Sequence, residues 1–275
     1  PQNLPRLSAA CPDIAAELLA SGDDELLALL YGKVTKFASS MIRSCLIAAS
    51  GHDLICADYI SIEGVFLAWL SDETWVLEAY RAGEDMYKHS AGAIYDVPYT
   101  NIGNPSKERQ VGKVAELALG YGGSTGALQD MAKGYQVELP AETEQKRIVK
   151  AWRNRRPATT HFWYACDDAA KKAVRNPRQA YTVRGCTFAV NGSFLTLQLP
   201  SGRHLYYLYP RVEPVLKPWG SEKMSVTYMG EDSKTKQWKR LDTFGGKLVE
   251  NITQACARDV LAAGLLRVED AWYPV

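Results

Sequence analysis

Apolar residues recur at helical spacing along most of the first 175 positions. Helix-breaking residues divide the pattern, with an interruption near Gly22 and a glycine cluster at 120–123 that ends a long helix. Ser71 and Ser106 each precede a run at helical spacing, as N-caps do. The pattern predicts helices over 12–32, 35–49, 62–70, from Ser71 onward, 84–95, from Ser106 to the glycine cluster, 141–153 and 158–175.

One short apolar run within this helical part predicts a strand. The turn Gly51-His52-Asp53 is followed by Leu54-Ile55-Cys56-Ala57, which runs directly into Asp58. A carboxylate at the end of a core strand must be paired, hydrated or bound to a metal ion.

The periodicity changes after position 180. Residues alternate between apolar and polar on either side of the turns Asn191-Gly192 and Pro200-Ser201-Gly202, which predicts an antiparallel meander. The range 217–239 is expected to be a polar connection that contains tryptophan, and 244–268 a final helix. The predicted class is therefore α+β, without internal repeats.

Composition narrows the class of protein. Of 275 residues, 47% are hydrophobic and 23% charged, and the net charge is +1, so affinity for a polyanion must come from local clusters. The six cysteines have no metal-ligand spacing, which favours buried free thiols. No apolar run approaches the ~18 residues of a membrane span, and the first residues do not resemble a signal peptide. A cytoplasmic protein without membrane contact is expected.

Two acidic residues and one helix are candidates for chemistry. Asp58 suits a divalent-cation ligand, with Glu63 one helical turn further on, although both could be purely structural. Arg109, Lys113, Leu117 and Tyr121 recur every four residues and form a slowly winding stripe. Two cations followed by an aromatic ring suit a nucleoside triphosphate, whereas the alternative is a solvated face ending in a core tyrosine.

The last helix and two basic runs could contact nucleic acid. Asn251 and Gln254 carry amides that can donate to minor-groove acceptors or simply bridge helices. The basic runs 146–156 and 171–178 could meet phosphates or form solvated faces.

Taken in order, these segments resemble the family A DNA polymerases, the group of bacterial DNA polymerase I and many bacteriophage replicases. DYISIEGV (58–65), followed by LAWLSDE, resembles the first signature, DYSQIELR. RQVGKVAELALGYGG (109–123) resembles the second, RxxxKxxxFGxxYG. The opening QNLPR, IRSCLIA (42–48) and GGKLVENITQACARD (245–259) resemble further elements of that family.

The resemblance implies template-directed DNA synthesis from primer–template DNA and dNTPs. Asp58 and the Tyr59 carbonyl would bind two Mg²⁺ ions, while Arg109 and Lys113 would hold the triphosphate. Lys113 would also offset or protonate the leaving group as the primer 3′-hydroxyl attacks.

Further roles follow from the same resemblance. Glu63 would lie beneath the incoming sugar, Tyr121 would stack near the templating position, and Tyr87 and Arg6 would contact the nucleotide. Leu117 replaces the aromatic residue that usually packs on that sugar, so sugar discrimination is expected to differ. The residues implied to contact DNA are Gln2, Asn3, Arg43, Gly122, Asn251 and Gln254.

The implied architecture is a partial right-hand polymerase fold, a palm plus mostly helical fingers that include the meander. We expect 1–75 to be palm, 76–240 fingers, and 241–275 a helix returning to the palm. The family's third signature, a His-Asp-Glu hairpin with the second metal-binding aspartate, is not found in the 275 residues. One carboxylate cannot clamp two metal ions about 3.5–4 Å apart, so a second chain or a further segment is expected to supply the other.

Two rival hypotheses remain at this point. The chain could be a non-catalytic nucleotide- or DNA-binding module that keeps the polymerase fold. A metal-dependent nuclease built on Asp58 is disfavoured, because no further acid cluster is evident. A polymerase would be expected in the cytoplasm of a bacterial or phage-infected cell.

Overall fold

The computed structural model describes residues 12–217 and 220–271, which divide into two compact units at Tyr59/Ile60. The first unit contains α1 (Pro12–Ser21), α2 (Asp24–Tyr31), α3 (Val34–Met41) and the 3₁₀ turn η1 (Ile42–Cys45). The helices of the second unit are α4 (Ile62–Ser71), α5 (Thr74–Arg81), α6 (Met86–Tyr95), η2 (Tyr99–Asn101), α7 (Lys107–Leu119), α8 (Thr125–Tyr135), α9 (Glu142–Arg155), α10 (Pro157–Arg175) and α11 (Gly245–Asp270). The α+β class is confirmed.

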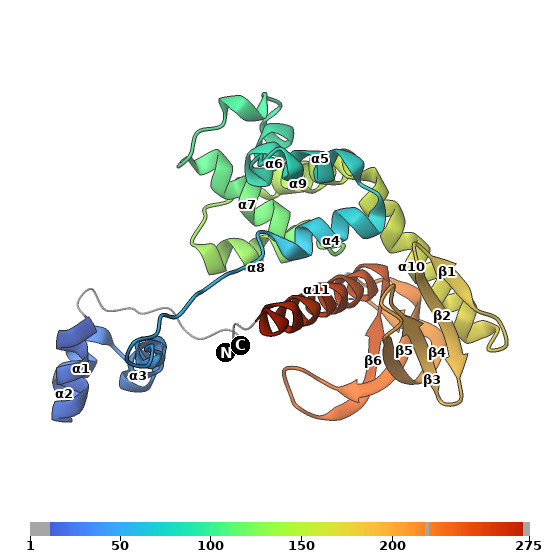
Figure 1. The fold of residues 1–275 in the computed structure, drawn as a ribbon. Helices are drawn as coiled ribbons and strands as arrows, with labels where there is room; N and C mark the ends of the chain where they lie inside the picture. The colour runs from blue at the N-terminus through green and yellow to red at the C-terminus, as the bar shows by residue number, and fades with distance from the viewer. Residues whose placement is uncertain (1–11, 218–219, 272–275) are drawn as a thin grey trace. The chain divides into compact units, whose positions relative to one another are not determined.

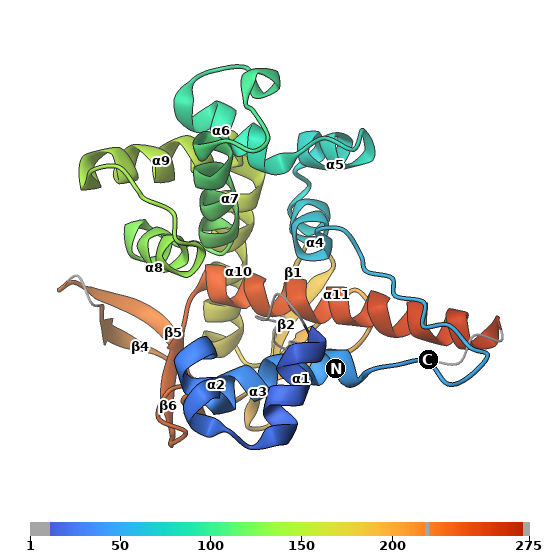
Figure 2. The same ribbon diagram turned by 90° about the vertical axis from the view of Figure 1, so that its left-hand side faces the viewer.

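A single six-stranded sheet lies between α10 and α11 in the sequence. Its strands are paired in sequence order, each antiparallel to the next, as the alternating pattern predicts. The strands are β1 (Tyr181–Val183), β2 (Cys186–Asn191), β3 (Phe194–Gln198), β4 (His204–Leu216), β5 (Glu222–Glu231) and β6 (Trp238–Thr243). Figures 1 and 2 show the helices α5–α9 on one side of α11 and the sheet on the other.

The main core joins these helices to the inner face of the sheet. It combines apolar side chains of α7, α9, α10 and the first half of α11 with those of the strands. Trp152 of α9 and Trp163 of α10 stack in it with ring centroids 6.0 Å apart, and Leu195 and Leu197 of β3 are fully buried. The helices α7, α9, α10 and α11 therefore share one core with the sheet.

Two glycines bring α7 into close contact with its neighbours. A side chain at Gly112 of α7 would overlap the Tyr87 carbonyl oxygen, so glycine lets α6 and α7 pack backbone to backbone. At Gly246 a side chain would overlap the Tyr121 carbonyl oxygen, so the start of α11 abuts the residues that follow α7. Both contacts place predicted site residues beside α7.

The prediction of a strand over 54–57 is wrong. These residues have no regular secondary structure, and Leu54 and Ile55 are 59% and 79% exposed. A strand forms only where a neighbouring chain accepts its backbone hydrogen bonds, and no such neighbour is found among the described residues. Residues 54–57 are apolar as predicted, but a strand also needs a partner strand, which the local sequence does not provide.

Three further expectations are corrected. Ser71 does not cap α5: it is the last residue of α4, and its hydroxyl donates to the Leu67 carbonyl at 2.7 Å. The range 217–239 is not a connection, because β4 continues past a bulge after Leu208 and pairs with β5. Helix α8 was not predicted, since its pattern follows a glycine cluster and contains two further glycines.

Candidate functional site

The first turn of α7 holds Arg109 in a defined orientation. Ser106 caps the helix, as expected, by accepting from the Arg109 backbone N–H at 3.1 Å. The Arg109 Nε donates to Asp85 Oδ2 at 2.6 Å, and its guanidinium lies 5.2 Å from the Tyr87 ring centroid. No hydrogen bond of its two Nη groups is found within the described part of the chain. Asp85 therefore orients the guanidinium and leaves its terminal fork available to an anion.

Lys113, one turn later, lies between two aromatic rings. Its Nζ is 4.2 Å from the ring centroid of Tyr135 on α8 and 6.0 Å from that of Tyr87 on α6. A cation held over ring faces keeps its charge and its donors while its long side chain is restrained. The structure brings Arg109, Lys113 and Tyr87 close together, and the sequence analysis does not single out Tyr135, because α8 was not predicted.

Tyr121 joins the far end of the stripe to a second predicted residue. Its hydroxyl donates to Glu63 Oε2 at 3.0 Å, which links the end of α7 to the start of α4. Burial raises the pKa of the Tyr121 phenol, and the Glu63 carboxylate raises it further. Leu117, between Lys113 and Tyr121, is 37% exposed. The stripe therefore presents two cations, an apolar side chain and a neutral phenol in order along α7 and the turn that follows it.

The opposite side of α7 is fixed by a buried carboxylate. Glu116 accepts from Ser90, Trp152 and Arg156, at 2.7, 3.0 and 2.6 Å respectively. The Arg156 side chain is only 3% exposed and lies against the rings of Trp75 and Trp152. Because α6, α7, α9 and the residue between α9 and α10 meet at this carboxylate, α7 cannot rotate without breaking buried hydrogen bonds. The sequence analysis did not single out Glu116, since its helical position does not distinguish it from a surface acid.

Asp58 and Tyr59 lie at the end of the first unit. Both are exposed, and no hydrogen bond or ion pair of the Asp58 carboxylate is found among the residues that are described. A carboxylate and a backbone carbonyl are hard oxygen donors of the kind that Mg²⁺ takes together with water and substrate phosphates. The donor chemistry therefore fits Mg²⁺, although the described residues contain no group of three or more His, Cys, Asp or Glu side chains.

A cavity of about 470 Å³ opens beside the turn that follows α7. Gly122 lines it with φ +77°, a conformation that favours glycine, and Trp163 and Phe244 pack close to that turn. Cations also line the cavity: Arg153 donates to the Gly123 carbonyl at 2.9 Å, and Lys217, directly after β4, pairs with Asp242 at 2.6 Å. Aromatic rings with cations at the margin suit single-stranded nucleic acid.

Asn251 and Gln254 lie on α11 where that helix meets the sheet. The Asn251 Nδ2 donates to the Tyr207 hydroxyl at 2.9 Å, and Gln254 is exposed. Of the other predicted DNA contacts, Arg43 lies in η1 of the first unit and is exposed. Gln2, Asn3 and Arg6 lie outside the described residues.

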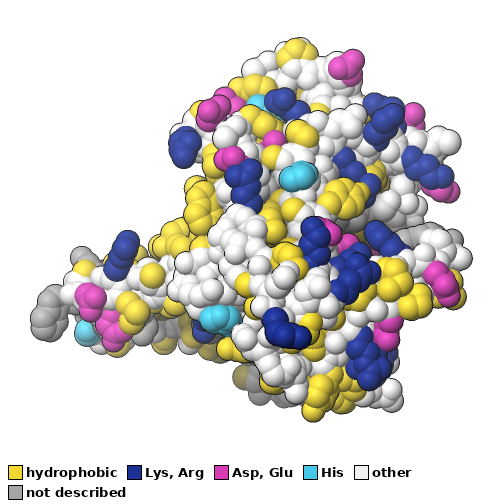
Figure 3. Space-filling view, turned by 90° about the vertical axis from the view of Figure 1, so that its right-hand side faces the viewer, with side chains coloured by type: hydrophobic (Ala, Val, Ile, Leu, Met, Phe, Trp, Pro, Cys, Tyr) yellow, Lys and Arg dark blue, Asp and Glu magenta, His cyan; other side chains and the backbone are white. Residues whose placement is uncertain are grey.

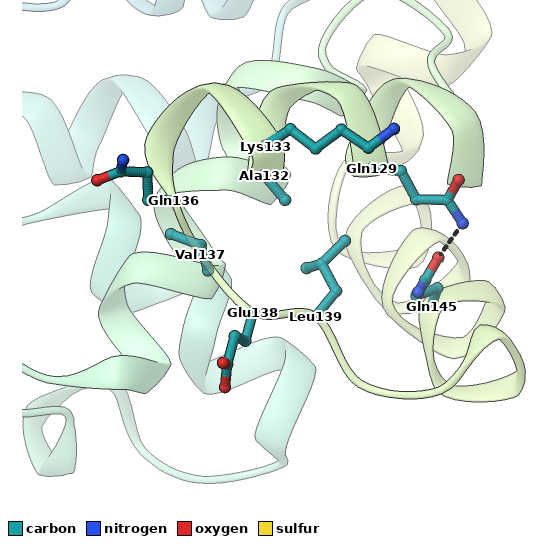
Figure 4. Close-up of a pocket in the computed structure, with 8 residues that line it drawn as sticks. All are labelled: Gln129, Ala132, Lys133, Gln136, Val137, Glu138, Leu139 and Gln145. Atoms are coloured by element: carbon teal, nitrogen blue, oxygen red, sulfur yellow. Dashed lines mark hydrogen bonds between the residues drawn. The ribbon is translucent and has the colours of Figure 1, made fainter.

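Other surface features carry less chemistry. The cavity between α8 and α9, about 410 Å³, is lined by Ala132, Val137 and Leu139 and bordered by the Gln129–Gln145 hydrogen bond, while the Glu138 side chain points away from it (Figure 4). Lys and Arg side chains are dispersed among acidic ones on the face that Figure 3 shows, rather than forming one continuous basic surface.

Five cysteines lie in the described part and are free thiols: Cys45 and Cys56 are exposed, and Cys166, Cys186 and Cys256 are buried. The expected burial is therefore confirmed for three of the five. Among the described helices, none has both the length and the apolar content that a membrane crossing requires.

Comparison with known proteins identifies relatives of the chain. The sequence model of DNA polymerase family A matches residues 33–186, more than half of the chain. A DNA polymerase of Bacillus phage SP02 is 42% identical over 272 residues, which is 99% of this chain and 41% of the relative.

Two bacterial relatives match shorter segments. DNA polymerase I of Treponema pallidum is 36% identical over 97 residues, covering 35% of this chain and 10% of the relative. DNA polymerase I of Aquifex aeolicus is 26% identical over 153 residues, covering 54% of this chain and 25% of the relative. The chain thus spans about two fifths of the phage protein and a smaller part of the bacterial ones.

Proposed function

Because the chain belongs to DNA polymerase family A, we propose that it forms the nucleotide-binding part of an enzyme for template-directed DNA synthesis. The observation that carries this proposal is the stripe on α7. Arg109 is oriented by Asp85, Lys113 is held between two rings, and Tyr121 is tied to the start of α4 through Glu63. Side chains fixed in this way are preorganised for a ligand whose charged end and flat end are far apart.

We propose the following roles at this stripe. The Arg109 Nη groups and the Lys113 ammonium bind the triphosphate of the incoming dNTP, because both keep donors free of buried protein partners. Lys113 also gives a proton or a compensating charge to the pyrophosphate as it leaves. Glu63, held by Tyr121, lies beneath the sugar and disfavours a 2′-hydroxyl, and Leu117 gives that sugar an apolar contact.

Asp58 and the Tyr59 carbonyl would hold Mg²⁺, which when bound supplies charge neutralisation and a more acidic primer hydroxyl. The second carboxylate ligand is proposed to come from outside these 275 residues. On this interpretation 1–75 and 241–275 belong to the palm and 76–240 to the fingers.

The single-stranded template is proposed to enter the cavity beside Gly122. Phe244, which is 43% exposed, would stack on a base, while Arg153 would meet the backbone phosphates. Asn251 and Gln254 would face the minor groove of the duplex on the other side of the primer end.

Primer extension tests the proposal most simply. The chain, alone and together with a polypeptide carrying the His-Asp-Glu hairpin, is incubated with primer–template, Mg²⁺ and each dNTP in turn. Incorporation of the templated nucleotide, strongly slowed in Asp58→Asn and weakened in Arg109→Ala at low dNTP concentration, is the expected result. Binding of dNTP and primer–template without synthesis in either mixture would instead identify a non-catalytic module, and the absence of both binding and synthesis would refute the proposal.

A further inference from the structure

The sheet and α11 enclose a cleft that contains the two amides predicted to contact DNA. Asn251 and Gln254 are three residues apart, so they lie on the same face of α11. The opposite side of the cleft is made by β4 and β5, and its volume is about 330 Å³. The residues that line it are Leu205, Tyr206, Tyr207, Tyr228, Asn251 and Gln254.

Tyr207 restrains one of the two amides. The Asn251 Nδ2 donates to its hydroxyl at 2.9 Å, and the Tyr207 side chain is only 5% exposed. The Tyr207 ring packs edge to face on Tyr228, with ring centroids 5.1 Å apart and planes at 83°. Burial raises the pKa of the Tyr207 phenol to about 12, so the hydroxyl stays neutral at ordinary pH. The acceptor for Asn251 is therefore fixed in position and in charge.

This hydrogen bond determines what Asn251 can still do. A side-chain amide has two N–H donors and one carbonyl acceptor, so one donor remains once the other is given to Tyr207. Because the amide is already restrained, using that donor for a ligand costs less conformational entropy. Every base pair presents acceptors, purine N3 and pyrimidine O2, in the minor groove. Donors of this kind can therefore hold a duplex of any sequence.

We propose that Tyr207 is a positioning residue. It fixes the Asn251 amide so that Asn251 and Gln254 together donate to minor-groove acceptors of the primer–template duplex, which makes the sheet part of the DNA-binding site. This inference rests on the proposed function. It also goes beyond the family match, which ends at residue 186, whereas the match to the phage polymerase extends over 99% of the chain and so takes in β3–β6.

The test measures affinity for primer–template by fluorescence anisotropy. Tyr207→Phe removes the hydroxyl and keeps the ring, and we expect dissociation constants roughly three- to tenfold higher. Tyr209→Phe is the matched control, since Tyr209 lies on the same strand, is 56% exposed and does not line the cleft. We expect it to bind like the unmodified protein.

A second duplex separates positioning from a merely structural effect. Its purines carry carbon in place of N3, which removes the purine acceptors of the minor groove without changing base pairing and leaves pyrimidine O2 in place. The unmodified protein is expected to bind this duplex more weakly than the natural one, whereas Tyr207→Phe and Asn251→Ala lose most of that discrimination. Combining the two substitutions should add little, because they interrupt the same interaction.

Two results would count against the inference in different ways. If Tyr207→Phe discriminates between the duplexes as well as the unmodified protein does, Tyr207 does not position a minor-groove donor and the inference is wrong. If Tyr207→Phe is poorly folded, the affinities of Asn251→Ala for the natural and the N3-substituted duplex replace it in this test. Unchanged discrimination in that variant would also refute the inference. If the unmodified protein binds neither duplex, the proposed function itself fails.

Discussion

The two parts of the predicted nucleotide site are built in different ways. Helix α7 carries Arg109 and Lys113, and Glu116 ties this helix to α6, to α9 and to Arg156 at the junction of α9 and α10. Asp58 lies in a segment, 46–59, that has neither helix nor strand, with exposed apolar side chains such as Ile47 and Ile55. Contacts within the second unit thus fix the positions of Arg109 and Lys113, whereas no contact within the described part of the first unit fixes the position of Asp58.

The difference follows from where backbone hydrogen bonds go. A helix satisfies its N–H and C=O groups within about four residues, so a periodic sequence with a cap is sufficient to form it. A strand needs a partner that is distant in sequence, and an apolar run alone does not provide one. Within the described residues, segment 46–59 has no pairing partner that would fix the position of Asp58.

The largest expected effect comes from Asp58→Asn in the active polymerase. Loss of the metal-binding charge should lower the rate of nucleotide incorporation by about 10³ or more, since a bound metal contributes several kcal/mol to the transition state. Because Asp58 is exposed and unpaired within the described residues, the melting temperature should not change.

Asp53→Asn, at an exposed position of the same segment, is the control and should retain activity. Equal activity of both variants in single-turnover assays would show that the carboxylate at position 58 is not a metal ligand.

Glu116→Ala tests the framework behind α7. Removing one member of a buried ion pair leaves Arg156 without its partner, and we expect unfolding free energy to fall by about 3–5 kcal/mol in urea titrations. Glu142→Ala breaks a pair whose members are both 67% exposed and should cost at most about 1 kcal/mol. Similar losses in the two variants would mean that α7 is not held through Glu116.

Arg109→Ala tests the ligand-facing side of the same helix. Loss of charge-assisted hydrogen bonds to the triphosphate should raise the dissociation constant for dNTP about 10- to 100-fold, measured by pre-steady-state kinetics. Lys107→Ala, an exposed cation in the same turn, should leave this constant within about twofold, because screening weakens exposed charges. An equal effect of both changes would indicate only a general loss of positive charge.

Asp85→Asn sharpens the same comparison. This substitution keeps an oxygen acceptor for Arg109 Nε but loses the negative charge. The dissociation constant for dNTP should therefore rise less than in Arg109→Ala, measured by the same kinetics. A rise as large as that of Arg109→Ala would mean that Asp85 does more than orient the guanidinium.

The smallest effect concerns Tyr121 in alkaline solution. Its pKa in the folded state is raised above 10.0, so the folded protein holds the phenol proton more tightly than the unfolded chain does. The contribution of this phenol to the free energy of unfolding is fully present below pH 10, the pKa in the unfolded chain. It is lost as the pH rises towards the higher pKa of the folded state, by at most about 1.4 kcal/mol per pH unit. Tyr121→Phe should lack this part of the alkaline loss in urea titrations at increasing pH. An unchanged slope would contradict the account of its burial.

The sequence predicted those features that depend on local pattern. Ser106 as a cap, the stripe from Arg109 to Tyr121 and the meander around Asn191-Gly192 all follow from spacing and turn residues. The Tyr121–Glu63, Lys113–Tyr135 and Asn251–Tyr207 contacts join residues far apart in sequence, so no local pattern could indicate them. Strand β5 was missed because its polar residues obscure an alternation that only pairing with β4 makes clear.

Affinity cleavage tests the central claim, that Asp58 and α7 act on the same triphosphate. Fe²⁺ replaces Mg²⁺ in the protein bound to primer–template and dNTP, and hydroxyl radicals, which added hydrogen peroxide and ascorbate generate at the metal, cut the chain nearby. We predict cuts both next to Asp58 and around 109–113, and neither in Asp58→Asn. Cuts next to Asp58 without cuts in α7 would contradict the claim.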